Sequence, residues 1–157
     1  MKTNQAAWPL RVLVVDDDRD TANSFAILLK LWGHYPLVAY RSVDALQMSG
    51  DQRPDVVLLD IGLPGIDGYE VARRVRRQPG MAEAFLIAVT GYGQPGDYEL
   101  SREAGFDLHL LKPVEPEELH EALAGARARP EDTGLCAPAP PRPSGRQIRL
   151  LSRPGAV

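Results

Sequence analysis

The residues with the clearest chemical potential in this sequence lie at the ends of apolar runs. Three carboxylates in succession, Asp16, Asp17 and Asp18, follow the run "RVLVV". Like charges this close together are unfavourable unless positive charge neutralises them. Single polar residues follow three later apolar runs: Asp60, Thr90 and Lys112. If these runs are parallel strands, the polar groups meet at the carboxyl edge of one sheet, where open α/β sheets bind ligands.

This combination of groups fits a site for a phosphoryl group. Mg²⁺ prefers oxygen ligands and takes one or two carboxylates, so two carboxylates after the first run and one after the third could bind it. The metal and Lys112 would stabilise negative charge during in-line transfer, and the Thr90 hydroxyl would donate a hydrogen bond. Asp60 would be the attacking carboxylate. Taken singly, each residue has a plainer role, and Asp18 or Asp20 is expected to cap a helix.

The elements that must position these groups alternate along the chain. The expected strands are Leu10 to Val15, Tyr35 to Ala39, Asp55 to Leu59, Phe85 to Val89, and Asp107 to Leu111. The first, third and fourth are almost continuous Val, Leu and Ile, as strands covered on both faces require. Helix-period segments separate them, which predicts five βα units. The right-handed crossover rule leaves the order 2-1-3-4-5 or a Rossmann-like half as the natural topologies.

Boundary residues mark the expected helices. The first expected helix has an apolar face from Ala22 to Trp32, and Gly33 ends it. The next three begin at a capping residue and are expected over Ser42 to Met48, Asp67 to Arg76, and Asp97 to Ala104, the last of which ends at Gly105. The final helix is expected to start near Glu115, with Pro116 in its first turn.

The bulk properties predict one domain with a tail. The chain has 157 residues, is 44% hydrophobic and carries a formal net charge of -3, which argues against coating nucleic acid or an anionic membrane with positive charge. Residues 1–9 form an N-terminal extension, 10–127 the domain, and 128–157 a tail rich in Pro and Arg that is expected to be disordered. A short partner-binding segment within "RQIRLLSRPGAV" is a less favoured alternative. The single Cys136 and the lack of an apolar stretch long enough for a membrane span predict a cytoplasmic protein.

Four stretches of the sequence resemble the receiver domain of two-component response regulators: "VLVVDDD", "DVVLLDIGLPGIDGYEVARRVR", "LIAVTGYG" and "GFDLHLLKPV". The resemblance covers about Leu10 to Ala126. It implies a flavodoxin-like, doubly wound, five-stranded parallel sheet in the order 2-1-3-4-5, with helices on both faces. It also implies Mg²⁺ as the cofactor.

The resemblance assigns roles to individual positions. Asp60 is implied to be the phospho-accepting aspartate, and Asp16 and Asp17 the acidic pair that binds Mg²⁺ with Asp60. The backbone carbonyl of Gly62 is implied as a further metal ligand. Thr90 and Lys112 are implied to contact the phosphoryl group. A cis peptide bond between Lys112 and Pro113 is implied as well.

The chain departs from the family pattern at two positions. His109 occupies the place of a Tyr or Phe in the fifth strand that serves as a switch, which puts an aromatic switch in doubt. Gly62 has no side chain at a position that influences the lifetime of the phosphoaspartate, and Tyr92 is a candidate to shade the site instead. Signalling is expected through protein contact, with Tyr98, Arg102 and His109 exposed on the interaction surface.

The resemblance implies that the phosphoryl group comes from a phosphohistidine on a sensor histidine kinase or a histidine phosphotransfer protein. The net charge and the lack of a membrane span predict no nucleic-acid or membrane partner. The chain would not be an enzyme beyond its own phosphorylation and dephosphorylation.

Three alternatives stand beside this interpretation. "GYGQPG", residues 91–96, has the letters of a dinucleotide-binding motif, but it follows the fourth strand rather than the first and contains Pro95. A phosphatase with an aspartate nucleophile would need a Thr two residues after Asp18, which is absent. A protein-interaction module that works without phosphorylation would share every one of these residues. Replacement of Asp60 by Asn would distinguish it.

Overall fold

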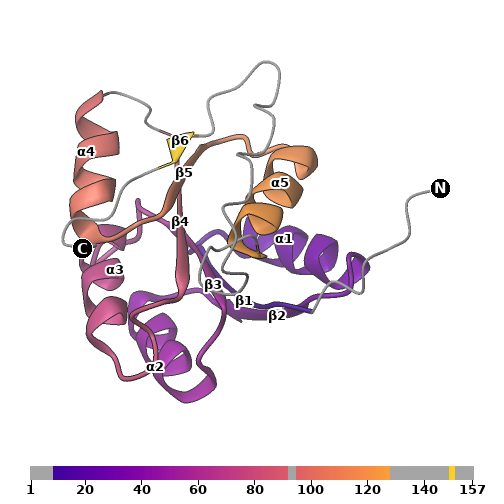
Figure 1. Ribbon diagram of the computed structural model, residues 1–157, viewed down its shortest axis with the longest axis horizontal. Coiled ribbons are helices and arrows are strands. Elements are labelled where there is room, and N and C mark those ends of the chain that lie inside the picture. Colours follow the sequence, from indigo (N-terminus) through magenta and orange to yellow (C-terminus); the bar gives the residue numbers. More distant parts are fainter. Residues whose placement is uncertain (1–8, 92–94, 128–148, 151–157) are drawn as a thin grey trace, which may run out of the picture.

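The computed structural model describes residues 9–91, 95–127 and 149–150, which form a sheet with helices on both of its faces (Figure 1). The strands are β1 (Arg11–Val15), β2 (Tyr35–Ala39), β3 (Val56–Asp60), β4 (Phe85–Thr90), β5 (Leu108–Leu111) and β6 (Arg149–Leu150). The helices are α1 (Arg19–Leu31), α2 (Ser42–Gln52), α3 (Gly68–Arg77), α4 (Pro95–Ala104) and α5 (Pro116–Arg127). No helix among these residues has the length and apolar character to cross a membrane.

The predicted topology is confirmed. The first five strands are parallel and lie in the order β2-β1-β3-β4-β5. β1 and β3 are therefore neighbours although a whole βα unit separates them in sequence, and Val15 lies opposite Leu59 at their carboxyl ends. Each strand matches its predicted range to within one residue. This order brings the polar residues that follow β1 and end β3 to one edge of the sheet.

Two apolar cores cover the two faces of the sheet, because alternate residues of each buried strand point to opposite sides. Leu13, Val57 and Leu86 face α2, α3 and α4, whereas Val12, Leu58 and Ile87 face α1 and α5. Figure 1 shows α1 and α5 together on one side of the strands and α2 and α3 on the other. Central strands buried on both sides explain the near-continuous apolar runs in the sequence.

Two of the predicted helix caps are confirmed. The Asp18 side chain accepts hydrogen bonds from the backbone N–H groups of Asp20 and Thr21 at the start of α1, at 3.0 and 3.3 Å. These donors, Thr21 first, lower the pKa of the Asp18 carboxyl. Asp67 accepts from the N–H of Glu70, at 2.9 Å, at the start of α3. The cap role of Asp18 leaves Asp16 and Asp17 as the acidic residues available to a site.

The starts of α2 and α4 differ from the predictions. Arg41, not Ser42, is the N-cap of α2. The Ser42 hydroxyl instead donates a hydrogen bond of 2.5 Å to the carbonyl of Ile66, which connects α2 to the loop before α3. The helix continues past Met48 to Gln52. The fourth helix begins at Pro95 rather than at Asp97, which is consistent with the preference of proline for the first turn.

Part of the predicted disordered tail is a strand. Arg149–Leu150 forms β6, which pairs antiparallel with β5, Leu150 opposite Leu108. This strand lies within "RQIRLLSRPGAV", the stretch in which the sequence offered a partner-binding segment as the less favoured alternative. The remaining tail residues, 128–148 and 151–157, and residues 1–8 of the predicted N-terminal extension lie outside the described residues.

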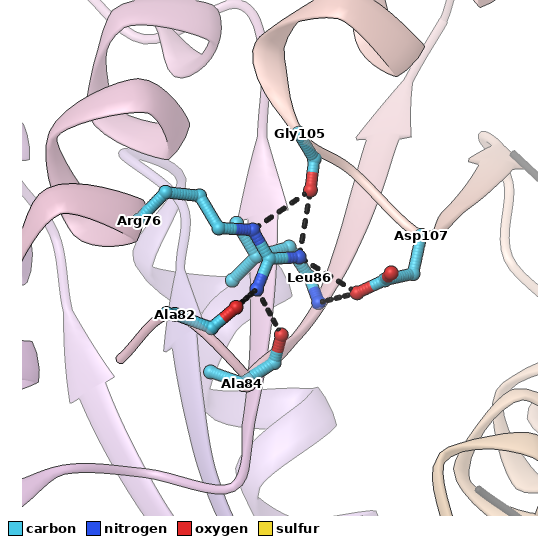
Figure 2. A network of polar contacts seen from close by, with 6 residues as sticks. All are labelled: Arg76, Ala82, Ala84, Leu86, Gly105 and Asp107. Carbon is cyan, nitrogen blue, oxygen red and sulfur yellow. Dashed lines mark hydrogen bonds and ion pairs between the residues drawn. The ribbon is translucent and has the colours of Figure 1, made fainter. Parts of the chain in front are cut away.

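At the amino-terminal edge of the sheet, a cluster of polar groups surrounds Arg76 of α3, and every N–H of its guanidinium has an acceptor (Figure 2). Its guanidinium donates to the carbonyls of Gly105, Ala82 and Ala84 and to the Asp107 carboxylate, 2.8 Å away. Asp107 also accepts from the N–H of Leu86 at 2.9 Å. All five N–H donors of the arginine are thereby used. The cluster connects α3, the loop before β4 and the loop before β5.

Candidate functional site

Three carboxylates converge at the carboxyl edge of the sheet. Asp16 follows β1 directly, Asp17 is the next residue, and Asp60 ends β3. Each of them contributes a carboxylate oxygen to a group in which these atoms all lie within 4.8 Å of one another. Asp16 and Asp60 are buried, whereas Asp17 is exposed. The sequence prediction that these residues meet is confirmed. Two members of the group are buried, and the group is open to solvent on the side of Asp17.

Lys112 brings the positive charge to this cluster. Its ammonium nitrogen lies 3.2 Å from Asp16 Oδ2 and 3.3 Å from Asp60 Oδ2. The backbone N–H of Lys112 donates to the carbonyl of Thr90 at 2.8 Å, which fixes the lysine beside the end of β4. The peptide bond between Lys112 and Pro113 is cis, as the resemblance implied. The ammonium of Lys112 thus contacts two of the three carboxylates.

The pKa values of Asp16 and Lys112 are both raised, and burial is the largest influence on each of them. Burial, together with the charge of Asp60, raises the pKa of Asp16 above its ordinary value, despite the opposing effects of the Asp18 N–H and Lys112. Burial lowers the pKa of Lys112, but the charges of Asp60 and Asp16 outweigh it and the net pKa is raised. Lys112 is therefore firmly protonated, while Asp16 is destabilised in its charged form. The cluster is short of positive charge.

The donor set fits a magnesium ion. All three groups are carboxylates, the hard oxygen ligands that Mg²⁺ selects, and the exposed side of Asp17 leaves room for water and for phosphate oxygens. Asp16 Oδ1 accepts the N–H of Asp18 at 2.9 Å, which fixes the orientation of its carboxylate before any metal binds. Asp16, Asp17 and Asp60 are the residues that would bind the ion.

Asp60 has a different partner on each of its two oxygens. Oδ1 accepts the backbone N–H of Gly62 at 3.0 Å, and Oδ2 faces Lys112. Thr90 is buried at the end of β4, next to Val89, which is the register partner of Asp60. The structure therefore brings Thr90 and Gly62 to the same edge as Asp60. The implied metal contact of the Gly62 carbonyl stays a prediction.

Gly68 is a positioning residue that the sequence analysis missed. It is the first residue of α3, and its N–H donates to the Ile61 carbonyl at 3.0 Å. A Cβ atom there would lie 2.5 Å from Ile61 Cα and 2.7 Å from the Asp60 carbonyl oxygen, so only glycine allows this approach. The first residue of α3 thus packs directly against the peptide bond between Asp60 and Ile61. The glycine after the cap residue in "IDGYE" is the signal that could have revealed it.

The predicted exposure of two interaction residues is wrong. His109 is completely buried, with Nδ1 3.0 Å from the Ser101 hydroxyl oxygen and its ring 4.6 Å from that of Tyr98. Tyr98 is itself only 5% exposed. Tyr98 and Ser101 are three residues apart and so lie on the inner face of α4, which covers the side chain of His109. Of the three predicted residues, only Arg102 is accessible, with 41% of its side chain exposed and an ion pair to Glu99.

Two expectations concern residues outside this description. Tyr92, the candidate to shade the site, lies outside the described residues, and so do the other two residues of 92–94 in the glycine-rich stretch 91–96.

Comparison with known proteins gives a consistent result. The family model described as "Response regulator receiver domain" matches residues 12–124. The DNA-binding response regulator MtrA of Mycolicibacterium paratuberculosis is 39% identical over 119 residues, 76% of this chain but 50% of that protein. An uncharacterized 14.6 kDa protein of Leptolyngbya boryana is 35% identical over 115 residues, 73% of this chain and 88% of the relative. This chain thus spans about half the length of MtrA and of another relative it matches, the transcriptional regulatory protein AfsQ1 of Streptomyces coelicolor.

Solved structures agree with the fold. A putative response regulator from Chloroflexus aurantiacus is 34% identical with a TM-score of 0.72, and the match covers 77% of this chain and 99% of that one. The receiver domain of sensor histidine kinase PA1611 from Pseudomonas aeruginosa is 27% identical with a TM-score of 0.71, over 77% and 99% of the two chains. That structure contains a magnesium ion coordinated in its active site cleft.

Proposed function

Because this chain belongs to the receiver domain family of response regulators, we propose that it takes a phosphoryl group onto Asp60 with the help of Mg²⁺. The single observation that carries the proposal is the cluster of Asp16, Asp17 and Asp60 with Lys112, which is rich in carboxylates and short of positive charge. Receiver domains are phosphoacceptor signalling modules. The assignment to this chain rests on residues that are all present and converge at one edge of the sheet.

The geometry supports attack by Asp60 on phosphorus. A carboxylate oxygen of Asp60 forms the new P–O bond while the P–N bond to the imidazole of the donor breaks, and the electron pair of that bond leaves with the ring nitrogen. Gly62 donates its N–H to Oδ1 and Lys112 contacts Oδ2, so the carboxylate is oriented before the reaction. The protonated Lys112 then stabilises negative charge on the transferred group, and the Thr90 hydroxyl adds a hydrogen bond. Bound Mg²⁺ would neutralise the carboxylates and the phosphoryl oxygens.

The donor and the output follow from the same chemistry. We propose a phosphohistidine on a sensor histidine kinase or a histidine phosphotransfer protein as the donor. The solved receiver of a sensor histidine kinase with magnesium in its cleft supports this choice. We propose protein contact, in the cytoplasm and without nucleic acid, as the output. MtrA binds DNA, but the match covers half of that protein.

The test is incubation with acetyl phosphate and Mg²⁺, followed by intact-mass analysis. Wild type should acquire one phosphoryl adduct that requires Mg²⁺, and Asp60→Asn should acquire none. Asp51→Asn is the matched control, since Asp51 is an exposed residue of α2, and it should be phosphorylated like wild type.

Two further results would contradict the proposal. If the folded wild type forms no adduct and does not bind beryllofluoride, the chain is an interaction module that works without phosphorylation. If it hydrolyses p-nitrophenyl phosphate with many turnovers, it is a phosphatase.

A further inference from the structure

The outer edge of β5 is occupied by a strand from the tail. Leu108 lies opposite Leu150 and His109 opposite Arg149 in antiparallel pairing. In Figure 1, β6 lies beside β5 with α4 on one side and α5 on the other. An open strand edge presents unpaired N–H and C=O groups to any extended segment. The β5 edge therefore accepts strand addition, and the occupant seen in the structure belongs to this chain.

The outer strand on the other side of the sheet, β2, differs from β5. Among the described residues β2 pairs only with β1, and it contains Pro36, which has no N–H to offer. Proline on an edge strand discourages the addition of another strand. β5, with the sequence "LHLL", has no such residue and is suited to receive one.

The sequence around β6 is suited to this edge. "RQIRLL", residues 146–151, combines a β-branched residue with leucines and stands between Gly145 and Pro154. From Thr133 to Val157 there is no acidic residue and there are four basic ones, Arg142, Arg146, Arg149 and Arg153. The segment is both strand-forming and positively charged.

The helices on either side of the β5 edge have the opposite charge. Together α4 and α5 contain six carboxylates, at Asp97, Glu99, Glu103, Glu117, Glu118 and Glu121, against the two guanidinium groups of Arg102 and Arg127. Strand pairing and charge attraction thus favour the same occupant. Backbone hydrogen bonds supply affinity in strand addition, and charge supplies selectivity.

We infer that the basic segment centred on Arg149–Leu150 is an intramolecular ligand of the β5 edge, and that this edge is an interaction surface for extended basic peptides. The segment competes with any partner that binds there. Residues 128–148, 21 in number, connect it to the end of α5. A linker of this length corresponds to an effective concentration on the order of 1 mM, so a free peptide of equal affinity would have to exceed that concentration to displace the segment.

Amide hydrogen exchange on the full chain, in the absence of any phosphodonor, tests this inference independently of phosphorylation. Leu150→Pro removes a backbone donor from β6 and should make the β5 amides exchange roughly tenfold faster than in wild type. Ala139→Pro places a proline in the already proline-rich part of the tail and should leave β5 exchange unchanged. Arg149→Glu keeps the backbone donor but reverses the charge, and should accelerate exchange at low salt more than at high salt.

Two results of the exchange experiment would overturn the inference. One is equal exchange of the β5 amides in wild type, Leu150→Pro and Arg149→Glu. The other is protection that increases with protein concentration, which would assign the bound strand to a second copy of the chain. In the complementary measurement, a fluorescent peptide of residues 144–155 should bind to the Leu150→Pro chain and only weakly to wild type. Failure to bind Leu150→Pro would also contradict the proposal.

Discussion

Two clusters of charged side chains lie at opposite ends of the same parallel sheet, and they are built on different principles. At the amino edge, one guanidinium, Arg76, faces one carboxylate, Asp107, and every N–H of the arginine has an acceptor. At the carboxyl edge, three carboxylates lie together and one ammonium contacts two of them, and burial with a neighbouring charge raises the pKa of Asp16. The first cluster is complete within the chain. The second is complete only with an added cation.

The difference separates a cluster that stabilises the fold from one that is available for chemistry. A buried ion pair with all its hydrogen bonds made is strongly destabilised by the loss of either partner. A cluster with excess like charge works in the opposite direction, since neutralising one member relieves repulsion. Substitutions at the two edges should therefore change stability with opposite signs.

The largest expected effect is at the amino edge. Arg76→Ala leaves the Asp107 carboxylate buried without its cation and three carbonyls without their donor. The free energy of unfolding should fall by about 3–5 kcal/mol. Urea denaturation measures it, and Arg77→Ala, at an exposed position next along α3, should change it by less than about 0.5 kcal/mol. Equal stability of the two variants would mean that the cluster does not stabilise the fold.

The next effect is the completion of the carboxyl-edge cluster by metal. Mg²⁺ at about 100 times its dissociation constant should stabilise wild type by about 2.7 kcal/mol, because the unfolded chain has no site. Thermal unfolding with and without Mg²⁺ measures this gain. Asp17→Asn should lose most of it, whereas Asp51→Asn should keep it. A gain of the same size in both variants would place the ion elsewhere.

Gly68 is the next residue whose substitution should affect both stability and the site. It is the first residue of α3, and it lies against the backbone of Asp60 in the carboxyl-edge cluster. In Gly68→Ala the new Cβ meets backbone atoms at 2.5 and 2.7 Å, so α3 or the end of β3 must move. Overpacking of this kind costs about 1–3 kcal/mol, and the displaced Asp60 should also slow phosphorylation by acetyl phosphate. Gly125→Ala in α5, where a Cβ would meet nothing within 4 Å, is the control and should be neutral or stabilising. Unchanged stability and phosphorylation in Gly68→Ala would show that the close contact is not required.

The sequence allowed the carboxyl-edge cluster to be predicted because its geometry follows from simple rules. Parallel strands end at one edge, and the residues after each apolar run are charged or hydroxyl-bearing, so Asp16, Asp60, Thr90 and Lys112 had to meet there. The strand order needed no more than the crossover rule and the family resemblance.

The amino-edge cluster could not be predicted in this way. Three of the acceptors of Arg76 are backbone carbonyls, which the residue letters do not report, and Asp107 is 31 positions away along the chain. The burial of His109 was missed because it depends on which face of α4 turns inward. That face is set by Tyr98 and Ser101 at a spacing of three residues.

A smaller effect of the opposite sign is expected within the carboxyl-edge cluster. Because the pKa of Asp16 is raised in the folded state, its neutral form is favoured there, and Asp16→Asn imitates that form. In metal-free buffer the variant should be more stable than wild type by about 1 kcal/mol. The penalty on wild type develops as the pH rises above the ordinary value of 3.8, so the difference should shrink as the pH falls toward it.

Urea denaturation in the presence of a chelator measures this difference. Mg²⁺ should reverse the order of the two proteins, since only wild type keeps the full set of ligands. A less stable Asp16→Asn in chelator would mean that the Lys112 ion pair outweighs the repulsion.

The smallest effect is expected for a group of ion pairs that is open to solvent, and it tests whether ion pairing without burial stabilises the fold. Glu70 on α3 accepts from Arg74 at 3.0 Å and from Arg73 at 3.3 Å, and these partners, Arg74 first, lower its pKa. A lowered pKa contributes stability that is present above the ordinary value of 4.5 and is lost as the pH falls through the folded-state value. Water screens this exposed group, so Glu70→Gln should differ from wild type only marginally at neutral pH and not at all in acid. Denaturation curves of the two proteins at both pH values measure the difference. A loss at neutral pH comparable with that of Arg76→Ala would show that ion pairing itself, rather than burial with every hydrogen bond made, makes the amino-edge cluster stabilising.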